Sequence, residues 1–173
     1  MILLFRPVGV VLAFLCLMIH PWMGFSQESL VRKTDQTVSV SSGVYSCLDL
    51  WATTGFVNVQ YQPGIRFWIL KPQAGALVSF KGSCMLYGGL LWPANPFDRL
   101  LIQTGAAFGY YYDGNGIPMG YPVEFRLSLS ILYEFRNKMQ LGLEAAHISN
   151  ANFSADNPGT ESIGMIFQVP MGR

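Results

Sequence analysis

Charge is scarce in this sequence of 173 residues. Only 12% of the residues are charged, and 11 Lys and Arg nearly balance 10 Asp and Glu, for a formal net charge of +1. A nucleic-acid-binding protein needs an excess of basic side chains to neutralise phosphates, so the composition excludes that class. Hydrophobic residues make up 51% and aromatic residues 14%. These values indicate one compact domain whose partners are apolar or amphipathic.

Long hydrophobic runs are missing after the start of the chain, so no transmembrane helix is predicted there. The first residues, MILLFRPVGVVLAFLCLMIHPWMGFSQ, combine Arg6 with an apolar run and then with small residues up to Ser26. This layout predicts a secretory signal peptide over residues 1–26 and a mature domain over residues 27–173. A membrane anchor remains an alternative, which we disfavour because the run is shorter than the roughly 20 residues that span a bilayer.

Cysteine is also rare, with three in the chain. Cys16 lies in the predicted signal peptide after Phe14 and Leu15, which are too bulky to precede a lipidated cysteine, so we expect an unlipidated protein. Cys47 and Cys84 remain in a compartment where disulfides persist. Their spacing does not decide whether they bond.

Segments of about ten residues alternate in polarity between turn-rich connections. In residues 122–135, PVEFRLSLSILYEF, every odd position is apolar and most even positions are charged or carry hydroxyls. Alternation alone fits a soluble sandwich, with its apolar face inward, or an outer-membrane barrel, with its apolar face outward. Aromatic residues near the strand ends favour the barrel, as interfacial girdles do; they include Trp92, Phe97, Tyr110, Tyr111, Tyr112, Tyr133 and Phe135.

The alternation predicts an all-β fold, an eight-stranded antiparallel transmembrane β-barrel of the outer membrane. The stretch WPANPFD is expected to be a connection, and the loop over residues 151–160 to be extracellular, together with Cys47 and Cys84. A barrel of this size is filled by its own side chains, which argues against a porin. The strands are expected at residues 37–47, 54–62, 66–79, 84–92, 99–112, 122–135, 139–150 and 161–170.

The stretch HISNANFSADNPGTES, residues 147–162, carries the candidate chemistry. His147 and Ser149 continue the outward, apolar row of their strand, and Glu161 begins the outward row of the next. Residues two apart on a strand share a face, so an imidazole reaches a hydroxyl. We expect Ser149 as nucleophile, His147 as general base and Glu161 as the carboxylate that fixes the imidazole tautomer.

An acyl-transfer site also needs hydrogen-bond donors for the oxyanion. Asn157 and the backbone amides of Asn150 to Asn152 are the candidates for oxyanion and substrate binding.

Each of these residues also has a structural interpretation. His147 fits an interfacial side chain, Ser149 a strand-ending hydroxyl and Glu161 a loop carboxylate, while NPG is a natural turn. Because the three side chains share the outward face, we give the catalytic and the structural interpretation nearly equal weight.

Other polar residues are expected to have no catalytic role. Glu124, Arg126 and Glu144 face the lumen by the same alternation and are expected to form a buried polar network, and Asp113 belongs to a loop. His147 is the only histidine after the signal peptide, so no metal site and no cofactor are expected.

The sequence from QLGLEAA through HISNANFSADNPGTES to VPMGR, together with VEFRLSLSILYEF, resembles the lipid A 3-O-deacylases of the PagL type. Residues 122–170 carry this resemblance. It implies an eight-stranded outer-membrane barrel with a His-x-Ser-Asn motif, a glutamate opening the last strand and an oxyanion-hole asparagine, which correspond to His147, Ser149, Asn150, Glu161 and Asn157. Asn152 stands where the family commonly has glycine, and asparagine tolerates unusual backbone angles.

The resemblance implies a serine esterase without cofactor that removes the 3-position acyl chain of lipid A. Its partners are then the lipopolysaccharide substrate and outer-membrane lipid, with the active site on the outer-leaflet side; a homodimer stays open. The alternatives are a non-catalytic structural or adhesive barrel and, more weakly, a soluble periplasmic sandwich or lipocalin-like binder.

Overall fold

The computed structural model describes residues 31–172, so the expected signal peptide over residues 1–26 lies outside the described residues. In these residues, no helix is long and apolar enough to cross a membrane. The main strands are β2 (Thr37–Tyr45), β3 (Thr54–Gln62), β5 (Lys71–Ser79), β6 (Cys84–Phe97), β7 (Leu100–Tyr112), β8 (Val123–Glu134), β9 (Gln140–Ser149) and β10 (Thr160–Pro170).

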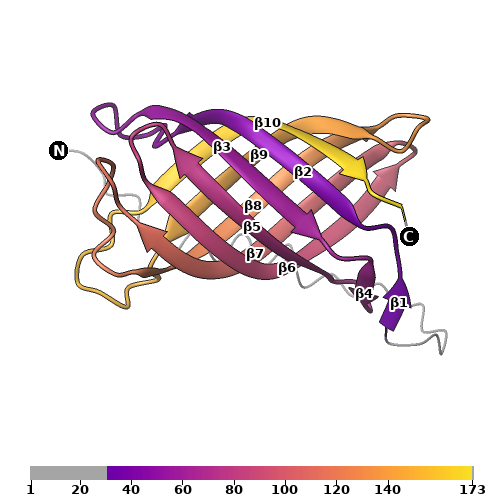
Figure 1. The fold of residues 1–173 in the computed structure, drawn as a ribbon, viewed down its shortest axis with the longest axis horizontal. Helices are drawn as coiled ribbons and strands as arrows, with labels where there is room; N and C mark the ends of the chain where they lie inside the picture. The colour runs from indigo at the N-terminus through magenta and orange to yellow at the C-terminus, as the bar shows by residue number, and fades with distance from the viewer. Residues whose placement is uncertain (1–30, 173) are drawn as a thin grey trace.

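These strands form one closed barrel in the order β10-β2-β3-β5-β6-β7-β8-β9 (Figure 1). Every neighbouring pair is antiparallel, including β10 with β2, which closes the wall. Gly43 lies directly opposite Gly164 at this closure, where a Cβ on Gly43 would meet the β10 backbone. The predicted all-β fold, an eight-stranded antiparallel β-barrel, is confirmed.

Strand β8 shows how the sequence sets the two faces of the wall. Its even positions from Glu124 to Leu132 are buried inside the barrel, while Ile131 and Tyr133 are 50% and 46% exposed on the outer face. Side chains on a strand alternate between faces, and a membrane barrel directs the apolar row outward. The sequence prediction of an apolar exterior is therefore confirmed.

Two predicted boundaries were wrong. The predicted strand over residues 66–79 is interrupted: a short strand β4 (Ile65–Phe67) pairs with β1 (Val31–Lys33), and the chain then turns before β5. Trp68 has a φ of 53° in this turn. The stretch WPANPFD is also not a connection, because β6 continues through most of it to Phe97 and pairs with β7.

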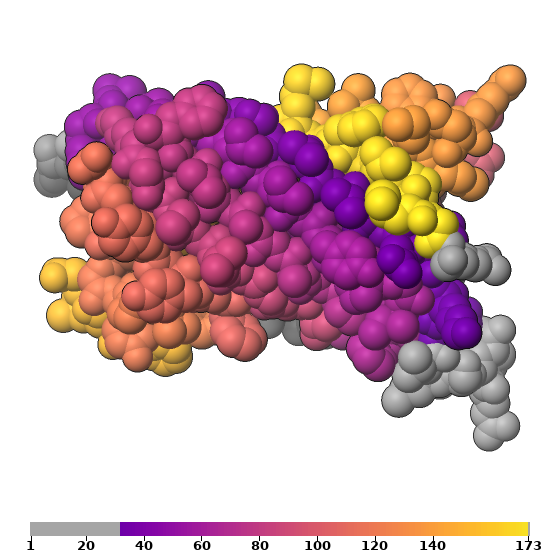
Figure 2. Space-filling model, in the orientation of Figure 1, coloured from indigo at the N-terminus to yellow at the C-terminus, as the bar shows by residue number. Residues whose placement is uncertain are grey.

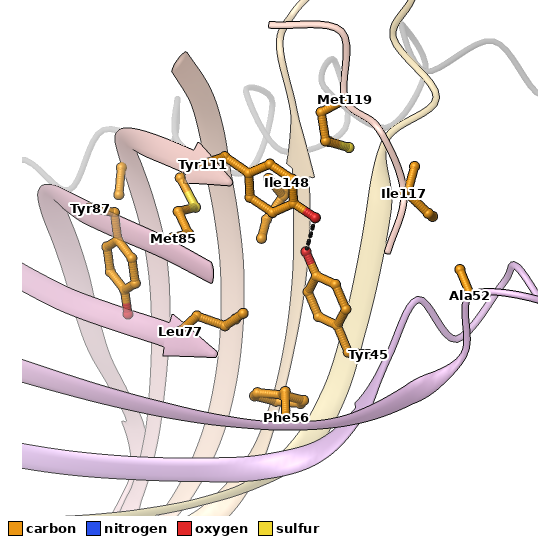
Figure 3. Close-up of a cluster of buried hydrophobic side chains, with 11 residues drawn as sticks. Tyr45, Ala52, Phe56, Leu77, Met85, Tyr87, Tyr111, Ile117, Met119 and Ile148 are labelled. Carbon is orange, nitrogen blue, oxygen red and sulfur yellow. Dashed lines mark hydrogen bonds between the residues drawn. The ribbon is translucent and has the colours of Figure 1, made fainter. Parts of the chain in front are cut away.

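Hydrophobic side chains project from the strands into the interior of the barrel (Figure 3). Tyr45 and Tyr111 join their hydroxyls there at 3.1 Å, within a cluster of buried hydrophobic residues. Figure 2 shows that side chains also cover the exterior continuously on the face that it displays.

A polar network lies in the lumen, as the alternation predicts. Arg126 donates to Glu144 at 2.7 Å, and both side chains are buried. Ser41 and Ser130 donate to the same carboxylate at 3.2 and 3.3 Å. Glu124 is fully buried, and neither carboxylate oxygen has a hydrogen-bond partner among the described residues. These ionisable side chains point into the lumen, on the opposite side of the sheet from His147.

The two ends of the barrel differ. One end carries the connections over residues 46–53, 80–83, 113–122 and 150–159, and we call it the loop end. The other, the turn end, carries the turn of Asp98 and Arg99, the β4 segment and the C-terminus (Figure 1). Exposed aromatic side chains gather at both ends, as expected for interfacial girdles; they include Phe80, Tyr110 and Tyr112 at the loop end and Phe97, Tyr133 and Phe135 at the turn end.

Candidate active site

His147 and Glu161 form a pair on the outer face of the barrel near the loop end. They are direct partners in the ladder between β9 and β10. The imidazole Nδ1 lies 3.0 Å from Glu161 Oε1, with the two side chains 25% and 30% exposed. An ionised carboxylate only accepts hydrogen bonds, so in this pair Nδ1 carries the proton. In the neutral ring, Nε2 is then the acceptor.

Ser149 ends β9 on the same outer face, two residues beyond His147. Its ladder partner is Phe125 on β8. Among the hydrogen bonds of residues 31–172, none joins the Ser149 hydroxyl to His147. The two Cα atoms of such a pair lie roughly 6.5–7 Å apart, which leaves the hydroxyl within reach of the imidazole after rotation of the side chains.

Gly159 packs against the imidazole. A Cβ added there would lie 3.0 Å from His147 Cε1 and 3.7 Å from Nε2, and the Gly159 φ of +69° is one that favours glycine. The ring is therefore bounded by the Glu161 carboxylate at Nδ1 and by the Gly159 backbone near Cε1. The sequence interpretation of NPG as a turn identified the glycine, but the turn alone did not reveal this contact.

Asn150 braces the loop that follows the serine. Its buried side chain donates to the carbonyls of Met119 at 2.9 Å and Asp156 at 2.8 Å. Its Oδ1 accepts from the Asn152 amide at 2.9 Å. This side chain is therefore committed to holding the β7–β8 and β9–β10 loops together.

The remaining candidate donors lie on the same loop. Asn157 Oδ1 accepts from the Asn150 amide at 3.0 Å, and its Nδ2 donates to Asn152 Oδ1 at 3.0 Å. One side-chain N–H of Asn157 remains, and the Ala151 backbone N–H has no partner among the hydrogen bonds of residues 31–172. Ala151 and Asn152 both adopt left-handed backbone, with φ of 53° and 67°. Asparagine accommodates that conformation better than most residues, so it suits a position where glycine is common.

A family model described as "Lipid A 3-O-deacylase (PagL)" matches residues 49–170. The chain belongs to this family. Membership assigns it to the lipid A deacylases of the outer membrane, which are hydrolases that modify lipopolysaccharide. No curated protein matches the chain.

Two solved structures show the same fold as this PagL-family chain. The first, "Crystal structure of the outer membrane enzyme PagL", has a TM-score of 0.62 at 19% identity and covers 78% of this chain and 99% of its own. The second, "De novo design of transmembrane beta-barrels", has a TM-score of 0.53 at 15% identity and covers 80% and 98%.

An apolar pocket lies on the outer face of this PagL-family barrel, next to the His147–Glu161 pair. Its volume is about 250 Å³. Sequence reasoning did not find it, because its walls combine side chains of three strands with the β2–β3 loop, which is distant from them in sequence. The pocket is lined by Cys47, Leu48, Leu127, Leu129, Ala145, Ala146, His147, Glu161, Ser162 and Ile163.

The cysteines are free thiols. Cys47 lies after the end of β2, where burial raises its thiol pKa and the Glu161 carboxylate raises it further. A raised pKa keeps the thiol protonated, and a protonated thiol is a poor nucleophile. In residues 31–172, no group of three or more His, Cys, Asp or Glu is arranged to hold a metal ion.

Proposed function

We propose that this protein hydrolyses the ester-linked 3-position acyl chain of lipid A, with Ser149, His147 and Glu161 as its catalytic triad. The observation that carries the proposal is the 3.0 Å contact between His147 Nδ1 and Glu161 Oε1 on the lipid-facing surface. A buried or inward pair would have no access to a lipid, whereas an outward pair meets acyl chains directly.

The reaction follows from the tautomer that Glu161 selects. His147 Nε2 takes the Ser149 hydroxyl proton while Oγ attacks the ester carbonyl, and the imidazolium then protonates the departing sugar alkoxide. The acyl group stays on Oγ until water, activated by the same Nε2, releases the fatty acid. Hydrogen bonds between nucleophile and base are commonly long before substrate binds, so a structure of residues 31–172 without a Ser149–His147 hydrogen bond is compatible with this role.

The tetrahedral oxyanion needs donors close to Ser149. We assign this role to the Ala151 amide and the remaining N–H of Asn157, because the other candidate donors in the loop are already engaged. Asn150 and Asn152 then act by holding this loop in its left-handed conformation. The loop end faces the outside of the cell in this proposal, so the site lies at the outer leaflet.

Mass spectrometry of lipid A from cells that express the protein tests the proposal. We expect the wild type to remove one acyl chain, assigned to the 3-position by fragmentation, and Ser149→Ala to leave lipid A intact. Glu161→Gln should slow the reaction by a factor on the order of 10²–10⁴, because the tautomer is no longer fixed.

Ser154→Ala is the matched control, since Ser154 lies in the same loop and its hydroxyl accepts a hydrogen bond from the Asp156 amide at 3.4 Å. It should behave like the wild type. Full deacylation by Ser149→Ala would refute the triad. Unchanged lipid A in cells that contain the folded wild-type barrel would favour a non-catalytic role.

A further inference from the structure

The apolar pocket beside the site results from one small residue among large ones. On the outer face, the ladders place Ala145 between Leu129 on β8 and Ile163 on β10. The next outward residue on β9 towards the loop end is His147, and the next towards the turn end is Leu143, which is 61% exposed. The small side chain of Ala145 therefore leaves a depression among larger side chains on the outer face.

The walls of the pocket are almost entirely apolar. Leu129 and Ile163 flank Ala145, while Leu48 adds a wall from the β2–β3 loop and is 73% exposed. Leu143 does not line the pocket and stands at its border towards the turn end. An apolar pocket of about 250 Å³ that opens next to the imidazole fits a stretch of saturated hydrocarbon.

The pocket lies in line with the proposed nucleophile. Ser149, His147, Ala145 and Leu143 occupy successive outward positions on β9. Four residues of strand separate Ser149 from Ala145, about 13 Å. A chain attached to Ser149 and directed along β9 therefore passes the imidazole before it reaches Ala145.

We infer that Ala145 determines which acyl chains the enzyme accepts, and that the pocket binds the chain being cleaved. This inference rests on the proposed function. Lipid tails are as apolar as the pocket, so entry from the bilayer brings no hydrophobic gain. Selection is then a matter of shape: Ala145 provides the space and Leu143 limits it.

The test uses the purified barrel in detergent with p-nitrophenyl butyrate, laurate and palmitate. Ala145→Phe should lower kcat/KM for laurate by about tenfold or more, because the ring occupies the space for the chain. Butyrate is too short to reach Ala145, so its kcat/KM should stay within about twofold of the wild type. Leu143→Ala should raise the ratio of kcat/KM for palmitate to that for laurate, because it extends the pocket.

Ala74→Phe is the matched control. Ala74 is also exposed on the outer face, on β5, which is four strands from β9 around the closed barrel. It should leave all three rates unchanged. Folding of each variant is checked by its heat-dependent mobility in gels.

Two results would overturn the inference: an equal loss on butyrate and laurate with Ala145→Phe, or unchanged chain-length preference in both Ala145→Phe and Leu143→Ala. Failure of the proposed function has a different signature, which is full activity of Ser149→Ala on laurate.

Discussion

The imidazole of His147 is oriented by two contacts of different kinds. Glu161 holds Nδ1 at 3.0 Å through a hydrogen bond. Gly159 limits the ring on the side of Cε1, where a Cβ would lie 3.0 Å away. A single hydrogen bond leaves a ring free to swing about it, so the second contact restricts where Nε2 points.

Gly159→Ala should therefore lower kcat more than its effect on stability explains. The left-handed backbone costs an alanine about 1–2 kcal/mol, and the methyl group also displaces the imidazole. We expect kcat for an ester substrate to fall about tenfold or more with little change in KM, because the substrate-binding surface is untouched. Steady-state kinetics and the ¹⁵N shifts of the His147 ring measure the two effects.

Gly82→Ala separates strain from contact. Gly82 has a φ of +84° and nothing within 4 Å of an added Cβ, so it suffers the same backbone strain at a distance from the ring. Equal kcat values for the two variants, with unchanged ¹⁵N shifts of the His147 ring, would show that Gly159 does not orient the imidazole.

At the scale of elements, β8 and β9 each present one face to the site and one to the lumen. Arg126 and Glu144 lie on their inner faces, joined at 2.7 Å, and the Arg126 guanidinium lies 5.0 Å from the ring centroid of Tyr87. This network connects the site strands to β2 through Ser41, which donates to Glu144. The polar interior thus holds β9, the strand that carries His147 and Ser149, in place against β8.

Arg126→Met should destabilise the barrel by about 3–5 kcal/mol, because it leaves the Glu144 carboxylate buried without its cation. Arg126→Met combined with Glu144→Met should recover most of that loss, since no unpaired charge remains. Urea unfolding in lipid vesicles, followed by tryptophan fluorescence, gives both values. Equal destabilisation of the single and double variants would show that the ion pair has no such role.

Alternation sufficed to predict the barrel strands because membrane and lumen impose opposite polarities on the two faces. Strand ends and turns were predicted wrongly where a residue type occurs outside its usual structural context. Pro93 and Pro96 indicate a connection, yet β6 pairs with β5 only as far as Leu91. Beyond that residue β6 has one free edge, where proline is tolerated. The turn after Phe67 was missed because FWIL contains none of the residues that typically mark turns.

The candidate site was also predictable only in part from the sequence. The alternation of polar and apolar residues indicated that His147, Ser149 and Glu161 share the outer face. The pairing of His147 with Glu161 and the alternating burial of β9 place them on that face. The alternation did not indicate which loop donors are already engaged, since Asn150 contacts Met119, 31 residues away in sequence. The pocket at Ala145 also depends on side chains of three strands, which no local pattern describes.

At the scale of the whole molecule, the two ends of the barrel differ in structure. The longer loops and the site lie at the loop end, while the C-terminus lies at the turn end (Figure 1). An outer-membrane barrel has short periplasmic turns and longer extracellular loops. We therefore expect the loop end to face the outside of the cell.

Cysteine labelling tests this orientation in a background that carries Cys47→Ser and Cys84→Ser. Ala155 lies in the loop after β9 and Arg136 in the turn after β8, and both are exposed. A membrane-impermeant maleimide should label the Ala155→Cys variant on intact cells and the Arg136→Cys variant only after lysis. The reverse pattern would place the proposed site at the periplasmic leaflet.

The central claim is that an outward hydroxyl, imidazole and carboxylate act as one unit at the lipid surface. An alkyl fluorophosphonate, which reacts only with activated serines, tests it most directly. Peptide mapping by mass spectrometry should place the adduct on Ser149 in the wild type, and His147→Ala should abolish it, since the hydroxyl is then no longer activated. An adduct on another serine, or one on Ser149 that forms equally fast without His147, would contradict the account.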